Sequence, residues 1–85
     1  MIRVLNSALK HGLEKNEIIA AFHSPFYFAQ IQDDPPKIML IGVGKLQPVE
    51  IGYTINQDGT IVIFHAMPAT KAILNQARRA RKQYP

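Results

Sequence analysis

The stretch Ile61-Val62-Ile63-Phe64-His65-Ala66-Met67-Pro68 decides how the rest of the chain is arranged. Its first four residues are apolar and mostly β-branched, which is typical of a buried strand, and we expect that strand over residues 60–66. Pro68 suits the first turn of a helix, and the Ala- and Arg-rich sequence after it has a helical pattern. His65 therefore lies where a buried strand leads into a basic helix, a rigid, surface-adjacent position that suits a reactive group.

Three further strands are predicted before this one. Residues 26–32 are aromatic and β-rich, residues 37–41 are apolar except for Lys37, and residues 49–55 alternate between apolar and polar side chains. The loop Asn56-Gln57-Asp58-Gly59 carries the Asp-Gly signal of a hairpin that leads into residues 60–66. Short connections of this kind join antiparallel neighbours, so we expect an antiparallel sheet of three or four strands.

Helices are predicted at both ends of the chain. Apolar residues recur at helical spacing over residues 2–11, which Gly12 ends, and over residues 14–23, which Ser24-Pro25 ends. The helix after Pro68 has small residues on one side and a basic stripe on the other. That stripe consists of Lys71, Asn75, Arg78, Arg79 and Lys82. The sequence thus predicts a single α+β domain over residues 1–85, with two N-terminal helices, the sheet and a C-terminal helix.

Composition narrows the classes of function. The 85-residue chain has no cysteine, which excludes disulfides and thiolate metal sites, and its three histidines are widely spaced, so neither a metal nor another cofactor is predicted. No apolar run is long enough to cross a membrane, and we expect a cytoplasmic protein without membrane contact. The net charge is +4, and every charged residue after Asp58 is basic, which indicates an anionic partner for the C-terminal helix.

Short motifs spread over nearly the whole chain resemble the BrnT family. They are Lys10-His11-Gly12-Leu13, Ala21-Phe22-His23-Ser24-Pro25, Ile41-Gly42, Gly44-Lys45-Leu46 and the segment from Ile63 to Thr70. BrnT proteins are small toxins of type II toxin–antitoxin systems and are similar in fold to RelE-type ribonucleases. The resemblance implies a RelE/BrnT-like fold and a metal-independent ribonuclease that cleaves RNA by attack of the 2′-hydroxyl. It also implies a cognate antitoxin of the ribbon–helix–helix type.

The strand–helix junction departs from the family pattern. It usually reads Ser-Ala-Arg-Arg-Ala-Thr in the family, whereas this chain has His65-Ala66-Met67-Pro68-Ala69-Thr70 and so lacks two cations expected near the phosphate. One alternative is therefore a non-catalytic module that kept the fold and binds RNA or a protein. Another is a subunit whose apolar edge strand, Phe26 to Ile31, pairs with a second copy or a partner. A homodimer is compatible with each of these functions.

Metal-independent RNA cleavage needs a base for the 2′-hydroxyl, an acid for the leaving oxygen and cations for the phosphate. Histidine suits the first two roles because its unperturbed pKa is about 6.5. His65 is the first catalytic candidate, followed by His11 and Lys37. The competing interpretations are that His65 shares a strand face with Ile61 and Ile63 and is partly buried, and that His11 stabilises a helix end. The candidate RNA-binding residues are Lys10, Lys45, Lys71, Arg78, Arg79 and Lys82.

Overall fold

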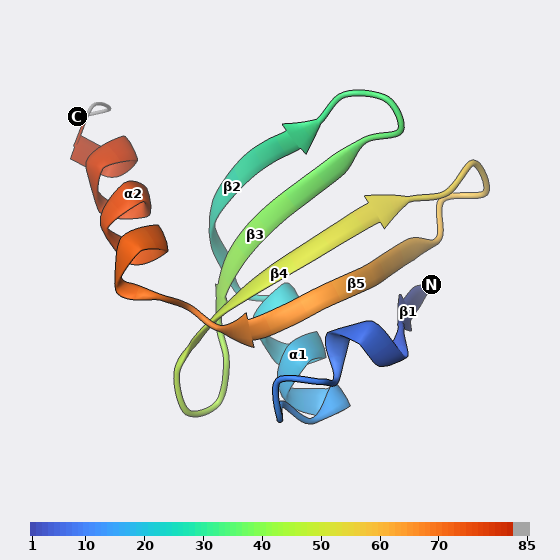
Figure 1. The fold of residues 1–85 in the computed structure, drawn as a ribbon, viewed down its shortest axis with the longest axis horizontal. Helices are drawn as coiled ribbons and strands as arrows, with labels where there is room; N and C mark the ends of the chain where they lie inside the picture. Colours follow the sequence, from blue (N-terminus) through green and yellow to red (C-terminus); the bar gives the residue numbers. More distant parts are fainter. Residues whose placement is uncertain (83–85) are drawn as a thin grey trace.

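A computed structural model of the protein describes the backbone of residues 1–82 and the side chains of residues 1–80. The strands form one five-stranded sheet in the order β1-β5-β4-β3-β2 (Figure 1). No helix in the described part of the chain has the length and apolar character needed to cross a membrane. In chain order the elements are β1 (Ile2–Val4), the 3₁₀ helix η1 (Asn6–Ala8), α1 (Lys15–Phe22), β2 (Pro25–Gln32), β3 (Lys37–Val43), β4 (Pro48–Ile55), β5 (Ile61–Pro68) and α2 (Lys71–Lys82).

The sheet is mixed, because β1 pairs with β5 in parallel while the other neighbours are antiparallel. Residues 2–11, predicted as a helix, instead form β1 and η1. Ile2 and Val4 flank Arg3, so this segment also alternates with period two, and pairing with β5 outweighs its helix propensity. The predicted RelE/BrnT-like arrangement, with two N-terminal helices and an antiparallel sheet of three or four strands, is therefore wrong. Only the broader α+β class is confirmed.

The remaining elements lie close to their predicted positions. Helix α1 falls within residues 14–23, and the four longer strands overlap residues 26–32, 37–41, 49–55 and 60–66. Pro68 does not begin the last helix, because it is the final residue of β5 and pairs with Val49. Helix α2 begins instead after Thr70, whose Oγ1 accepts a hydrogen bond from the Ile73 amide at 3.2 Å, as an N-cap residue does.

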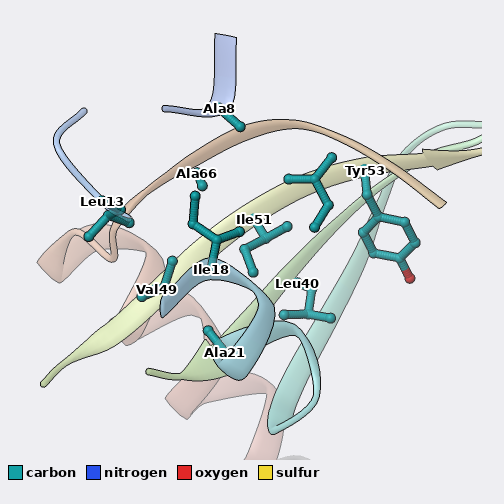
Figure 2. Close-up of a cluster of buried hydrophobic side chains, with 10 residues drawn as sticks. Ala8, Leu13, Ile18, Ala21, Leu40, Val49, Ile51, Tyr53 and Ala66 are labelled. Atoms are coloured by element: carbon teal, nitrogen blue, oxygen red, sulfur yellow. The ribbon is translucent and has the colours of Figure 1, made fainter. Parts of the chain in front are cut away.

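Helix α1 packs on one face of the sheet, which we call the first face. Its residues Ile18 and Ala21 are fully buried against side chains of β3, β4 and β5 (Figure 2). Close contact between helix and sheet depends on Gly42 of β3, because a Cβ atom there would overlap the backbone carbonyl of Ala21. The core therefore requires a glycine at position 42 for reasons of space rather than of backbone angle.

Helix α2 contacts the opposite, second face near the start of β2. Ile41 is fully buried, although side-chain alternation along β3 points it away from α1. Tyr27, its pairing partner on β2, accepts a hydrogen bond at 3.0 Å from Nε2 of Gln76 on α2, and Ala77 of the same helix is only 2% exposed. Helix α2 is thus placed beside the start of β2 (Figure 1), and it leaves side chains farther along β4 and β5 partly exposed.

Candidate functional site

A β-bulge in β5 determines where His65 points. Tyr53 of β4 lies opposite Ile63, but the preceding Gly52 lies opposite His65, so Phe64 is an extra residue in the ladder. An inserted residue reverses the alternation of side chains, which have a period of two. His65 therefore lies on the second face, and Ala66 takes the buried position on the first face. The prediction that His65 shares a face with Ile61 and Ile63 is wrong for this reason.

Gly52 provides the space into which the bulge folds. A Cβ atom at this position would lie 3.0 Å from Cε1 of Phe64 and 3.3 Å from Cβ of His65. The Phe64 ring consequently lies over Gly52 on the second face. Nζ of Lys37 is 5.8 Å from the centroid of that ring, within the range of a cation–π interaction. Lys37 is therefore close to the residue that immediately precedes His65.

Glu50 of β4 is the carboxylate partner of His65. Its Oε2 is 3.1 Å from Nε2 of His65, and the side chains of Glu50 and His65 are 15% and 32% exposed, respectively. Alternation places Glu50 on the second face, since its neighbours Val49 and Ile51 are fully buried on the first. A carboxylate accepts hydrogen bonds, so the neutral His65 ring carries its proton on Nε2 and its Nδ1 is the basic nitrogen.

His11 reaches the same site from the other side of β5. The Ser7 hydroxyl of η1 donates a 2.7 Å hydrogen bond to the carbonyl of Phe64, so η1 runs alongside the bulge. The turn after η1 then brings the His11 ring to His65, with ring centroids 5.6 Å apart in an edge-on arrangement at 74°. Gly12, with a φ of 85°, turns the chain away toward α1. His11 is thus held by the β5 contact rather than at the end of a helix.

We call this group the His11–His65–Glu50 cluster. It unites two of the three predicted catalytic residues, which come from opposite ends of the chain, at a partly exposed position on the sheet. One imidazole can accept a proton while the other donates one, and the carboxylate orients His65. Within the described residues, no group of three or more His, Cys, Asp and Glu side chains is arranged to hold a metal ion.

The predicted RNA-binding residues lie in three places. Lys10 is exposed and adjoins His11 in the chain. Lys45 lines a separate hollow of about 410 Å³ together with Glu14 and Glu17, whose carboxylates compete with a phosphate for its charge. Lys10 is therefore better suited than Lys45 to hold a phosphate at the cluster.

The third place is helix α2. Lys71, Arg78 and Arg79 are exposed there, and the two arginines line different hollows. Arg79 lies beside Tyr27 in a hollow of about 520 Å³, and Arg78 lies beside Phe26 in one of about 310 Å³. The side chain of Lys82 lies outside the described residues. No hydrogen bond or ion pair of residues 1–80 joins α2 to the cluster, so α2 forms a separate basic surface.

Sequence reasoning missed Glu50 as a member of the site. Alternation in residues 49–55 does place it opposite the buried side chains, and a hairpin between β4 and β5 brings it near the end of β5. The missing information was the bulge, because an unbulged ladder points His65 to the other face. Comparisons of the chain with protein-family models, with curated proteins and with solved structures find no match.

Proposed function

We propose that the protein is a metal-independent ribonuclease that cleaves RNA by attack of the 2′-hydroxyl on the adjacent phosphate. The observation that supports this most directly is the His11–His65–Glu50 cluster, in which two imidazoles lie 5.6 Å apart and one of them, His65, contacts a partly buried carboxylate. Two histidines supply both the base and the acid that this reaction requires near neutral pH. The net charge of +4 favours a polyanionic substrate.

Each residue of the cluster has a distinct role in the proposed reaction. His65, oriented by Glu50, accepts the proton of the 2′-hydroxyl through Nδ1 as the 2′-oxygen bonds to phosphorus. The bond from phosphorus to the 5′-oxygen then breaks, and His11 in its protonated form donates a proton to that oxygen. The products are a 2′,3′-cyclic phosphate and a free 5′-hydroxyl. Lys37, whose Nζ lies 5.8 Å from the ring centroid of Phe64 next to His65 in the chain, and Lys10, which adjoins His11 in sequence, are the cations that we assign to stabilise the charge on the phosphate.

The resemblance of the sequence motifs to BrnT proteins places this activity in a biological setting. On that basis we assign the protein as the toxin of a type II toxin–antitoxin pair that acts in the cytoplasm. Its partner is an antitoxin of the ribbon–helix–helix type, which binds the exposed basic surface of α2. The prediction is that a neighbouring small gene encodes such an antitoxin.

A second function is favoured by two specific observations. The junction from His65 to Thr70 lacks the arginine pair of the family, and the α2 cations have no hydrogen bond or ion pair to the cluster within the described residues. A protein with this arrangement binds RNA or a protein partner through α2 and catalyses no reaction on it. RNA binding that weakens as the salt concentration rises, without any cleavage of the RNA, supports this second function over the nuclease.

The test is incubation of the purified protein with an end-labelled single-stranded RNA in the presence of EDTA. We expect cleavage that leaves a 2′,3′-cyclic phosphate, and a loss of about 100-fold or more in His65→Ala and in His11→Ala. His23→Ala is the matched control, because His23 is an exposed histidine at the end of α1 and outside the cluster. Intact RNA in every lane contradicts the nuclease, and equal cleavage by all variants contradicts the histidine mechanism.

A further inference from the structure

The outer edge of the sheet at β2 is an unusual surface for a protein that stays monomeric. Within the described residues, strand β2 pairs only with β3, so its other side has no neighbouring strand, and in Figure 1 only α2 lies on that side. Phe26, Phe28 and Ile31 on this strand are 36%, 54% and 60% exposed. Natural edge strands are usually protected by lysine or other charged side chains, yet Pro25–Gln32 contains no charged residue.

Two bulges define which part of the edge is free to pair. The register of β2 against β3 shifts between Pro25 and Tyr27 and again between Gln30 and Gln32. Tyr27–Gln30 is therefore a regular segment between two irregular ones. An added strand aligned on this segment continues the sheet, whereas a strand shifted far along it meets a bulge. The bulges thus limit the register of any partner strand.

Charges at the two ends of β2 favour a particular partner. The turn that follows β2 contains Asp33 and Asp34, which are exposed and form no ion pair within the described residues. Beside the start of β2, Arg78 adjoins Phe26, and Arg79 adjoins Tyr27. Each copy therefore carries acidic side chains at one end of the edge and basic side chains at the other.

We propose that two copies of this chain form a homodimer by antiparallel pairing of their β2 strands. A two-fold axis near Phe28 and Ala29 places the acidic turn of each copy beside Arg78 and Arg79 of the other. The complementary contact then occurs twice, as it must in a symmetric interface. Phe28 and Ile31 become less exposed in the same arrangement. A partner strand without acidic residues at this end lacks that complementarity.

The test is sedimentation equilibrium over a range of about 1 μM to 1 mM, suited to the affinity expected of a small interface. We expect the mass to rise from the chain mass of 9.6 kDa toward twice that value as concentration increases. Phe28→Lys should raise the dissociation constant at least about tenfold, since it adds like charges next to the axis. Leu46→Lys is the matched control: Leu46 is 86% exposed but lies in the loop between β3 and β4.

Charge reversal tests the proposed register. Asp33→Lys with Asp34→Lys, and separately Arg78→Glu with Arg79→Glu, should each weaken the dimer about tenfold, while all four changes together restore it. Circular dichroism checks that every variant keeps the fold. A monomer at all concentrations overturns the proposal and assigns the edge to a strand of another protein. The proposal is also overturned if Phe28→Lys leaves the dissociation constant of the dimer unchanged. The same holds if the variant with all four charge reversals dimerises as weakly as the two double variants.

Discussion

At the residue scale, the position of one extra residue determines the chemistry available to His65. Phe64 is accommodated because Gly52 opposite it has no side chain, and the resulting bulge turns His65 toward Glu50. Without that insertion the histidine occupies the first face, among apolar side chains that offer it no carboxylate. A single backbone irregularity therefore separates a core histidine from one that is held, partly exposed, beside a second histidine.

Glu50 orients His65, and this role predicts a specific kinetic effect. Glu50→Gln keeps the shape of the side chain but removes the charged acceptor, so we expect kcat for RNA cleavage to fall roughly 10- to 100-fold. KM should stay within about twofold, because Glu50 is 15% exposed and acts through His65 rather than on RNA. Single-turnover and steady-state kinetics separate the two effects. A rise in KM with kcat unchanged contradicts the orienting role.

Tyr53 makes stability depend on alkaline pH. Burial raises the pKa of this tyrosine above its ordinary value of 10.0. The unfolded chain therefore loses the proton first, and the stability that Tyr53 contributes is complete below about pH 10 and is lost as pH rises through the folded-state value. Tyr53→Phe removes this loss while keeping the ring contact with Phe22, whose centroid is 5.3 Å away.

Urea denaturation at several values between about pH 8 and 11 measures the effect. The free energy of unfolding of the unmodified protein should decrease relative to that of Tyr53→Phe at the alkaline end. The other tyrosines are common to both proteins, so their titration cancels in the difference. If the free energy of unfolding changes with pH in the same way for both proteins over the whole range, the prediction is wrong.

At the element scale, two glycines allow neighbouring elements to approach each other closely. They differ in the atoms that an added Cβ atom would meet. A Cβ atom at Gly42 meets the backbone carbonyl of Ala21 in α1, which can move only with the helix. A Cβ atom at Gly52 meets the ring of Phe64 at 3.0 Å, and a ring can shift by a few tenths of an ångström. The first contact is therefore a matter of packing between helix and sheet, and the second concerns the position of the bulge.

This difference predicts opposite profiles for two alanine substitutions. Gly42→Ala should destabilise the fold by about 1–3 kcal/mol or more, because overpacking forces α1 off β3. Gly52→Ala should cost less stability, yet it should lower RNA cleavage by more than its effect on folding explains, since it displaces Phe64 and His65. Thermal unfolding and cleavage at a temperature where both variants are folded provide the comparison. The prediction is wrong if the two variants lose equal stability and Gly52→Ala cleaves RNA as fast as the unmodified protein.

At the scale of the whole molecule, the sheet separates the histidine cluster from the free edge of β2 and from α2, which lies beside the start of that strand. The His11–His65–Glu50 cluster lies at β4 and β5, the basic surface lies on α2, and the free edge lies at β2, with β3 and β4 between β2 and β5. Pairing at β2 therefore leaves the cluster accessible. The proposed catalysis can therefore be tested by substitutions separate from those that test the dimer. Arg78 and Arg79 enter both the proposed dimer contact and the proposed anion binding, so Phe28→Lys is the substitution that tests the dimer alone.

The basic surface of α2 predicts how RNA binding responds to salt. Arg78→Gln with Arg79→Gln should weaken binding to RNAs of different sequence by similar factors. The slope of log affinity against log salt should decrease by about 0.7 for each phosphate of a single strand that the variant no longer neutralises. His65→Ala, which changes no α2 residue, serves as the control and should leave the slope nearly unchanged. If the double variant keeps the full slope, α2 does not contact RNA.

Sequence by itself determined the local elements of this protein. The periodicity of residues 49–55, the apolar run that begins at Ile61, the Asp-Gly loop between them and the amphipathic pattern of residues 14–23 each depend on near neighbours. A strand or helix overlaps each predicted range, although β5 extends to Pro68. Basic character in the last helix also follows from composition alone. These features are readable because they arise from contacts within a few residues.

Only the tertiary structure decided the sheet edge and the site. Residues 2–4 form a strand because β5, far away in the sequence, offers an edge for pairing. Their local pattern fits both a helix and a strand, so it does not decide between the two. The bulge at Phe64 likewise depends on the absence of a side chain at Gly52 in the facing strand. His11, Glu50 and His65 meet through these two long-range contacts, so their assembly follows from packing rather than from sequence spacing.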